Sequence, residues 1–337
     1  MRASTRARPG AKARPAVRAE ERADRRGVDR CTILAGTASR GLADAVAREA
    51  GVPLGRVEVE RFPDGELTVR IDESVRDRDV FLLQATSSPV NEHLVELLAL
   101  ADACRRGSAG RITAVVPYFG YARSDRRAGR REPIMAGLVA EVLEAAGVDH
   151  VVVIDLHTPQ VEGFFRVPVD HLTAIPVLAE AARDRLEEGT VVVSPDVGAV
   201  DRATAFARRL GLGVAITHKR RVSGERVEVV RVIGEVEGKA CLIVDDMIST
   251  GGTVAACVAA LREAGAGDGF MVAATHAVLS PGARERLADA GVREVIVTNT
   301  VASEGEAWPA LRVVSVAPLL AGAVRRLIAG ESLSGLA

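Results

Sequence analysis

The sequence has few aromatic residues and almost no net charge. Aromatic residues make up 3% of its 337 residues, and the formal net charge is −1 at pH 7. A chain with so little net charge has no overall electrostatic attraction for nucleic acid or for an anionic membrane, so we expect neither as a partner. Phosphate ligands would have to be held by local charge.

The sequence also lacks paired cysteines and long apolar runs. The four cysteines are scattered and form no Cys-x-x-Cys pair, which disfavours a zinc site and predicts buried thiols in a reducing compartment. No apolar run approaches the length that spans a bilayer, and nothing resembles an apolar signal peptide. We therefore expect a cytoplasmic protein.

Residues 1–30 differ in composition from the rest of the chain. They hold nine Arg and one Lys against four acidic residues, with almost nothing to bury, so the sequence predicts a disordered basic tail. A nucleic-acid-binding arm or a targeting peptide is the alternative, but Glu20, Glu21 and Asp24 are atypical of a transit peptide.

From Cys31 onward, strand-length apolar runs alternate with segments of helical spacing. The first expected strands are Cys31–Ala35, Val80–Gln84, Ile112–Val116 and Val151–Leu156, with helices at Gly41–Ala50, Asn91–Cys104 and Pro133–Ala146 and two short strands around Phe62. Later strands are expected at Thr190–Ser194, Gly213–Thr217, Val227–Ile233, Ala240–Val244, Phe270–Thr275 and Glu294–Thr298, and helices at Ile175–Leu186, Arg202–Leu210, Val254–Leu261 and Pro318–Ile328.

This alternation predicts an α/β protein with two doubly wound parallel-sheet domains. The length of the chain also favours two domains, each large enough for its own core. We place the domains at residues 31–172 and 173–337. The last helix has an apolar face that would pack on either domain.

The segment 240–253 combines a strand, two carboxylates and a turn rich in hydroxyl groups. The apolar run Ala240–Val244 ends at Asp245 and Asp246, and the residues after it are Ser249, Thr250, Gly251, Gly252 and Thr253, which open an amphipathic helix. Free amides at a helix N-terminus bind phosphate, and the acid pair suits a sugar diol or Mg²⁺. Any α/β protein has strands, turns and capped helices, but this order of parts favours a sugar-phosphate site.

A second motif, residues 117–127, follows the strand Ile112–Val116 directly. It holds both tyrosines of the chain and a group of arginines that includes Arg123. Because ligands of α/β sheets bind at the carboxyl ends of the strands, aromatic and guanidinium groups there indicate a polyphosphate site rather than a solvated charge run.

The segment Arg61–Glu66 lies between the two short strands. Pro63, Asp64 and Gly65 are a strong turn signal, and a plain hairpin is therefore a sufficient explanation. The alternative is functional, because Phe62 flanked by acids can stack on a purine and accept hydrogen bonds from its amine.

Two further groups of polar residues follow strands. Alternation along Val151–Leu156 places Asp155 and His157 on one side. A lone histidine is usually structural; the alternative is that His157 and Asp196, both at the carboxyl ends of strands, hold one Mg²⁺ between the domains. Lys219, Arg220 and Arg221 precede a turn-like stretch at residues 222–226. This group is either a surface charge cluster or a mobile cationic flap over transferring phosphates.

The segment 244–253 resembles the phosphoribosyl-pyrophosphate loop shared by phosphoribosyltransferases and ribose-phosphate diphosphokinases. From about Cys31 to its end, the chain resembles the diphosphokinases in the order and spacing of all these motifs. The resemblance implies two phosphoribosyltransferase-like domains, with ATP bound in the first and ribose 5-phosphate in the second. It implies transfer of the diphosphoryl group of Mg-ATP to the anomeric hydroxyl of ribose 5-phosphate, a step in nucleotide biosynthesis.

The resemblance also assigns roles to residues of this chain. ATP-binding positions are Phe62, Asp64, Gly65, Glu66, Arg123 and Ser124, and Mg²⁺ positions are His157 and Asp196. Catalytic positions are Lys219 and Arg221, and ribose 5-phosphate positions are Arg221, Asp245, Asp246, Ser249, Thr250, Gly251, Gly252 and Thr253. In the family, the turn around Phe62 serves a neighbouring subunit, so the resemblance implies a homo-oligomer, at least a dimer and by family likeness a hexamer.

Two residues depart from the family pattern. Ser124 stands where the family usually has Gln, and Ser249 stands where it usually has Asp. Ser124 is too short for the same reach to ATP, whereas Ser249 keeps a polar group beside the phosphate. A regulatory relative without activity and a phosphoribosyltransferase are the two alternatives, but the flap and the loop look intact and the motifs at Phe62 and Arg123 disfavour a transferase.

Overall fold

The computed structural model describes residues 27–127, 129–221, 227–302 and 308–336, with only the backbone for residues 219–230. Of the predicted tail, residues 1–26 lie outside the described residues. Gly27 and Val28 are helical, and Asp29 and Arg30 form a turn. The Gly27 carbonyl accepts from the Cys31 thiol, and Val28 packs against the hydrophobic core.

Within the described residues, the first sheet has the strand order β2-β1-β5-β6-β7-β8 and is parallel throughout. Its strands are β1 (Cys31–Ala35), β2 (Leu54–Gly55), β5 (Asp79–Leu83), β6 (Arg111–Val116), β7 (His150–Ile154) and β8 (Val169–Leu172). The connecting segments contain η1 (Thr37–Ser39), α2 (Arg40–Ala50), α3 (Val90–Arg106), α4 (Met135–Ala146) and η2 (Pro159–Phe164). Strands β3 (Val57–Arg61) and β4 (Leu67–Ile71) form a separate antiparallel hairpin.

The second sheet has the order β11-β10-β9-β12-β13-β14-β15 in the described part of the chain, and it is parallel except for the β10–β11 pair. Its strands are β9 (Val191–Ser194), β10 (Gly213–Arg221), β11 (Val227–Ile233), β12 (Cys241–Ile248), β13 (Phe270–Ala277), β14 (Val292–Thr298) and β15 (Leu311–Val314). The helices that follow the first sheet in sequence are α5 (Ile175–Arg183), η3 (Val197–Ala199), α6 (Val200–Leu210), α7 (Gly252–Glu263), α8 (Ala283–Asp289) and α9 (Ala317–Ala329). The predicted α/β fold with parallel sheets is thus confirmed.

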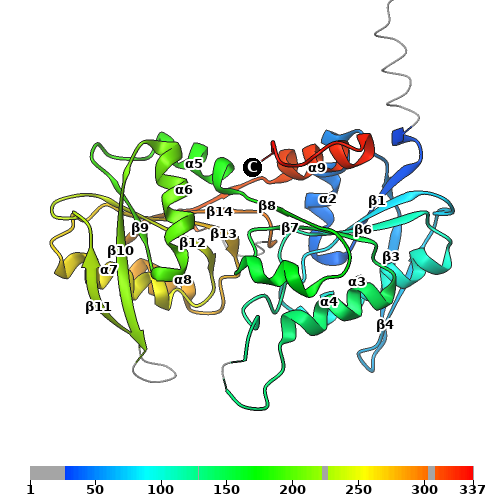
Figure 1. Cartoon of the computed structure of the whole chain (residues 1–337), viewed down its shortest axis with the longest axis horizontal. Coiled ribbons are helices and arrows are strands. Elements are labelled where there is room, and N and C mark those ends of the chain that lie inside the picture. Colours follow the sequence, from blue (N-terminus) through cyan, green and yellow to red (C-terminus); the bar gives the residue numbers. More distant parts are fainter. Residues whose placement is uncertain (1–26, 128, 222–226, 303–307, 337) are drawn as a thin grey trace, which may run out of the picture.

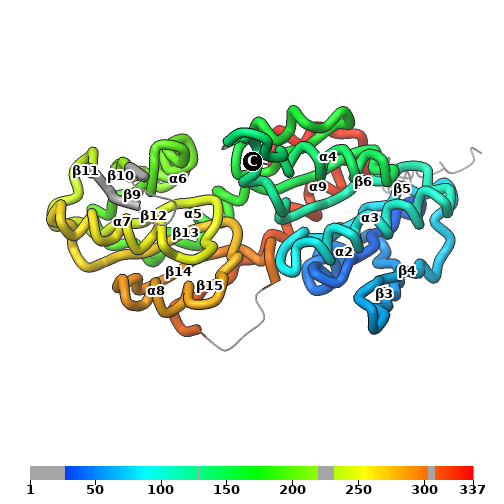
Figure 2. The backbone as a smooth tube through the Cα atoms, turned by 90° about the horizontal axis from the view of Figure 1, so that it is seen from below, coloured from blue at the N-terminus to red at the C-terminus, as the bar shows by residue number. Residues whose placement is uncertain are grey.

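Each sheet with its helices forms a lobe, and the two lobes lie side by side along the long axis (Figures 1 and 2). In the first lobe, Val152 and Ile154 face the side covered by α2, whereas Val151 and Val153 face the side covered by α3 and α4. Because both faces are buried, the central strands are mostly apolar. One core runs from the α2 side of the first sheet to the α5 and α6 side of the second.

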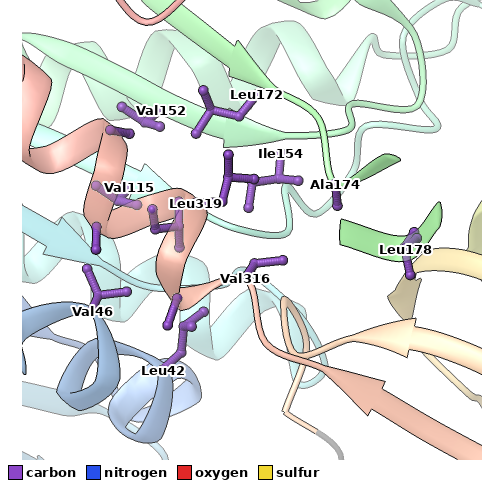
Figure 3. Packing of buried hydrophobic residues seen from close by; sticks show 14 of the residues in the cluster. Leu42, Val46, Val115, Val152, Ile154, Leu172, Ala174, Leu178, Val316 and Leu319 are labelled. Atoms are coloured by element: carbon purple, nitrogen blue, oxygen red, sulfur yellow. The ribbon is translucent and has the colours of Figure 1, made fainter. Parts of the chain in front are cut away.

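Helix α9, the last in the chain, lies beside α2 on the first lobe (Figure 1). Leu319 and Val316 of this C-terminal region pack with Leu42 and Val46 of α2 (Figure 3). The chain therefore crosses back from β15 of the second sheet to cover the first. Among the described residues, no helix is both long enough and apolar enough to cross a membrane.

Several boundaries differ from the sequence prediction. The strand expected to run through Asp155 and Leu156 ends at Ile154, because Asp155 takes a left-handed conformation with φ of 40° that breaks the alternation. Strand β12 continues past its apolar run to Ile248, because its neighbour β13 extends equally far and Met247 pairs with His276. Strand β10 likewise continues to Arg221, where it pairs with β11.

Among the described residues, three strands and one α-helix have no counterpart in the predicted set, namely β2, β8, β15 and α8. β2 has two residues, β8 and β15 are partly exposed strands at the edges of their sheets, and α8 has seven residues. Their sequences therefore lack the apolar length that marks a central strand or a long helix.

The packing of α9 on α2 predicts a large stability loss for Leu320→Ala. Leu320 is 1% exposed, and truncation would leave a cavity that lowers the free energy of unfolding by about 2–5 kcal/mol. The same truncation at Leu54, which is 40% exposed, should cost less than about 1 kcal/mol. Chemical denaturation of both variants measures the difference, and equal losses would contradict the packing.

The cysteines predict slow thiol chemistry in the native state. All four are free and buried, and burial raises the pKa of the Cys104 thiol to about 12 and that of Cys241 to about 11. Because the thiolate is the reactive form, native protein at pH 8 should react with a disulfide reagent far more slowly than unfolded protein, which should release four equivalents. Rapid reaction of one thiol without denaturant would contradict the burial.

Candidate active site

The two lobes meet at a contact between predicted site residues. His157 follows β7 of the first lobe, and its Nδ1 lies 2.7 Å from Oδ2 of Asp246 in β12 of the second lobe. Asp246 is 3% exposed, whereas the His157 side chain remains 39% exposed. The structure therefore joins the carboxyl end of the first sheet to the acid pair of the second.

The electrostatics of the acid pair depend on an arginine. The Arg202 guanidinium lies 3.9 Å from Asp245 and 4.0 Å from Asp246. Burial opposes the charge on Asp246, but the hydrogen bond with His157 and the charge of Arg202 outweigh it and hold the pKa of Asp246 below its usual range. Burial, together with the charge on Asp246, raises the pKa of Asp245 well above its usual value. The pair therefore carries its negative charge mainly on Asp246.

The pKa of His157 also depends on its contact with Asp246. The hydrogen bond with Asp246 raises the pKa of His157, although burial acts in the opposite direction. A carboxylate that holds one ring nitrogen also fixes the orientation of the ring. Nε2 of His157 is thereby left as the ring atom that can meet a ligand.

The loop after β6 lies next to this contact. Oγ1 of Thr158 donates to Asp125 at 2.7 Å, which ties residues 117–127 to the segment that carries His157. Arg123 and Ser124 line a pocket of about 520 Å³ together with Tyr118 and Tyr121 from the same loop and with residues at the start of α3. Such a volume suits a ligand of nucleotide size.

Ser124 has a structural role in addition to its place in the pocket. Its Oγ accepts from the Met135 amide at 3.3 Å, and its carbonyl accepts from the Ala136 amide at 3.1 Å. Both amides belong to the first turn of α4, so Ser124 caps that helix from a distance in sequence.

The turn after β12 has the geometry of an anion cradle. Gly251 has φ of 75°, and a Cβ there would lie 3.3 Å from the Ala283 carbonyl oxygen, so only glycine fits without strain. Helix α7 starts at Gly252, which puts the amides of its first turn beside Thr250 and Thr253. The Ser249 hydroxyl lies 3.2 Å from the Ser280 hydroxyl, and the Thr250 carbonyl accepts from Arg286.

His157 and Asp196, the two residues predicted to bind Mg²⁺, make hydrogen bonds with different partners. Asp196 caps η3 by accepting from the Ala199 amide at 3.1 Å, whereas His157 makes its hydrogen bond with Asp246. Among the described residues, no group of three or more His, Cys, Asp or Glu side chains forms a metal cage. The donor types nevertheless fit Mg²⁺, which keeps several waters and takes only one or two protein ligands when it binds with phosphate.

The hairpin that carries Phe62 stands apart from the junction. Phe62 is 41% exposed at its tip, and Gly65 has φ of 93°, so the predicted turn is present. Arg61 pairs with Glu92, which lines the pocket, and lies 3.7 Å from the buried Glu96. These ion pairs fix the turn end of the hairpin on α3.

The flap residues can be followed only in part. Lys219 and Arg221 lie in the antiparallel β10–β11 ribbon, where their backbones pair with Val229 and Val227. Their side chains and residues 222–226 lie outside what the structure describes, so the predicted flap stays a prediction. The roles assigned to the other site residues also stay predictions.

Three residues near the candidate site could not be identified from the sequence. Arg202 has the appearance of an ordinary charged residue on a helix, and its place beside the acid pair follows from how α6 packs on the second sheet. Thr158 and Asn91, which accepts from Tyr121, are single polar residues outside any motif. Only the pairing of distant segments reveals them.

Comparison with known proteins agrees with this geometry. Residues 31–147 match the family model described as the N-terminal domain of ribose phosphate pyrophosphokinase, and residues 221–337 match the phosphoribosyl synthetase-associated domain. The ribose-phosphate pyrophosphokinase of Ralstonia nicotianae is 47% identical over 307 residues, which cover 90% of this chain and 97% of the relative. That of Clostridium tetani is 48% identical over 309 residues, which cover 90% and 96%.

A solved structure supports the same relationship. The crystal structure of phosphoribosylpyrophosphate synthetase from Mycobacterium smegmatis matches with a TM-score of 0.82 and 47% identity, over 89% of this chain and 99% of that one. With two matching family models and curated relatives aligned over nearly their full length, the chain belongs to the ribose-phosphate pyrophosphokinase family.

Proposed function

We propose that this protein transfers the diphosphoryl group of Mg-ATP to the anomeric hydroxyl of ribose 5-phosphate, giving AMP and 5-phosphoribosyl 1-pyrophosphate. The observation that carries the proposal is the contact between His157 and Asp246, which brings the pocket of the first lobe next to the acid pair of the second. A reaction between a nucleotide and a sugar phosphate needs two such sites that share one boundary.

The second lobe supplies the groups for the sugar. The amides of the first turn of α7, with Ser249, Thr250 and Thr253, hold the 5-phosphate, and Asp245 and Asp246 orient the ribose hydroxyls. The glycines at 251 and 252 allow the backbone to approach the phosphate closely.

The first lobe supplies the groups for the nucleotide. Arg123 in the pocket meets the phosphates of ATP, and Ser124 lines the same wall. Phe62, Asp64 and Glu66 meet the adenine of a neighbouring subunit, since an aromatic ring left 41% exposed suits a pocket completed between two chains. The protein is therefore proposed to act as a homo-oligomer, at least a dimer.

The chemistry is an in-line displacement. The anomeric oxygen of ribose 5-phosphate forms a bond to the β-phosphorus of ATP, the bond between that phosphorus and the bridging oxygen to the α-phosphate breaks, AMP leaves with that oxygen, and the hydroxyl proton is released to solvent. No protein nucleophile is needed, because alignment and charge neutralisation provide most of the catalysis.

Charge neutralisation is shared between the protein and a metal ion. His157 through Nε2 and Asp196 are proposed to hold Mg²⁺, which when bound neutralises phosphate oxygens. Asp246 keeps the His157 ring in place for this purpose. Lys219 and Arg221 are proposed to meet the negative charge that develops on the transferring group.

Phosphorus NMR of purified protein with Mg-ATP and ribose 5-phosphate tests this function. We expect resonances of AMP and of a pyrophosphorylated ribose to appear together at equal rates. With 5-phosphoribosyl 1-pyrophosphate and a nucleobase supplied instead, a phosphoribosyltransferase would release pyrophosphate, and a regulatory relative would give no turnover in either assay. Either of these two results would refute the proposal.

Lys219→Ala tests the role of the flap. If Lys219 meets charge that exists mainly in the transition state, kcat should fall by about 10³-fold while the affinity for ATP, measured by calorimetry, changes little. Lys239→Ala is the matched control and should keep its kcat, because the Lys239 side chain forms an exposed ion pair with Glu235 at 3.4 Å and belongs to none of the predicted site motifs. A Lys219→Ala enzyme with full kcat and a raised KM would show uniform substrate binding instead.

A further inference from the structure

Asp155 is a buried carboxylate next to the candidate site that the proposed mechanism does not use. It follows β7, is 6% exposed and has φ of 40°, a left-handed conformation that costs free energy in a residue other than glycine. Such a conformation persists only where the surroundings hold it. For Asp155, those surroundings come from three separate segments.

The contacts of Asp155 join the two lobes. Its Oδ2 accepts from the Thr275 hydroxyl of β13 at 2.6 Å and from the Ala174 amide at 2.9 Å. Its own amide donates to the Leu172 carbonyl at the end of β8 at 3.0 Å. One side chain thus links the first sheet, the start of α5 and the second sheet.

A buried histidine completes the connection. His276 is 2% exposed, and its Nε2 lies 3.1 Å from the Asp155 carbonyl oxygen, which can only accept, so Nε2 carries the proton. Its Nδ1 lies 2.9 Å from the Thr300 hydroxyl oxygen, which also contacts the Thr275 carbonyl oxygen at 3.1 Å. Burial lowers the pKa of His276 and keeps the ring neutral, and the ring packs edge-on against Tyr118, with centroids 5.0 Å apart.

Strand register places this connection beside the site. Asp245 pairs with Ala274 and Met247 with His276, so Asp246 lies beside Thr275 on the neighbouring strand. The first lobe therefore reaches β13 through Asp155 and, two residues later, reaches β12 through His157. Both contacts come from one short segment, residues 155–157.

We propose that Asp155, Thr275 and His276 form an interlobe lock that holds His157 opposite Asp246 and so aligns the nucleotide half of the site with the sugar half. These are positioning residues, since none of them is placed against a substrate. The proposal rests on the proposed function, in which two substrates held by different lobes must react. A misplacement of about 1 Å between the reacting groups is enough to cost about 10² in rate.

The test is Thr275→Val, which keeps the shape of the side chain and removes the hydroxyl that Asp155 accepts from. We expect kcat to fall by about 10²-fold, while the KM values for ATP and for ribose 5-phosphate change by less than about threefold, because each substrate binds to its own lobe. Thr275→Ser restores the hydroxyl and should recover kcat to within about threefold.

Two further variants separate positioning from general stability. Thr32→Val removes a buried hydroxyl from β1, whose nearest partner is the Pro53 carbonyl at 3.5 Å, far in sequence from the lock, and should leave kcat unchanged. Thr300→Val removes the partner of His276 without touching Asp155, and we expect about a tenfold loss of kcat with the same constancy of KM. It provides the test if Thr275→Val does not fold.

Hydrogen exchange gives a readout that does not depend on activity. In Thr275→Val, backbone amides near residues 155–174 and 274–277 should exchange faster than in wild type, whereas those of β1 should not change. If the wild-type protein had no diphosphokinase activity, the proposed function would be refuted. The interlobe lock would still be supported by faster hydrogen exchange in Thr275→Val. Full kcat in an active enzyme carrying Thr275→Val, or unchanged exchange at these segments, would overturn the lock.

Discussion

The hydrogen bonds between the segment after β7 and strands β12 and β13 are the constraint on which the site depends. The pocket belongs to the first lobe and the anion cradle to the second, and neither holds both kinds of group. Because the carboxylates of Asp155 and Asp246 are buried, breaking their bonds with Thr275 and His157 would leave these carboxylates short of partners. The boundary between the two lobes therefore has a defined geometry, although the apolar core around it is held by interactions that have no preferred direction.

Much of the fold could be predicted from the sequence because both sheets are covered on both faces. Central strands such as β1 and β6 are mostly apolar, and the helices between them have one apolar stripe, so local patterns suffice. Strand ends are harder. Where β12 stops depends on how far β13 extends beside it, and where β7 stops depends on the conformation that distant partners impose on Asp155.

In the candidate site, too, local patterns could be predicted from the sequence and long-range contacts could not. Residues that lie within one motif, such as Asp245 with Gly251 or Arg123 with Ser124, are found from order and spacing. The structure places the first pair in β12 and in the turn after it, and the second pair in the loop that follows β6. Contacts between motifs are not encoded locally. Nothing near His157 in sequence indicates that Asp246 is its partner, and Arg202 resembles many helix-surface arginines. Such pairs become visible only after the lobes are packed.

The path of the last helix has a consequence for synthesis of the chain. Helix α9 covers the α2 face of the first lobe, although it is made after the whole second lobe. While the ribosome is still translating residues 173–316, Leu42 and Val46 cannot yet pack against α9. The α2 side of the first lobe therefore stays incompletely covered during this time. The first lobe, although it is synthesised first, is therefore completed only when the last residues of the chain are released. A polypeptide truncated before Ala317 would expose the apolar surface of α2 to chaperones and to aggregation.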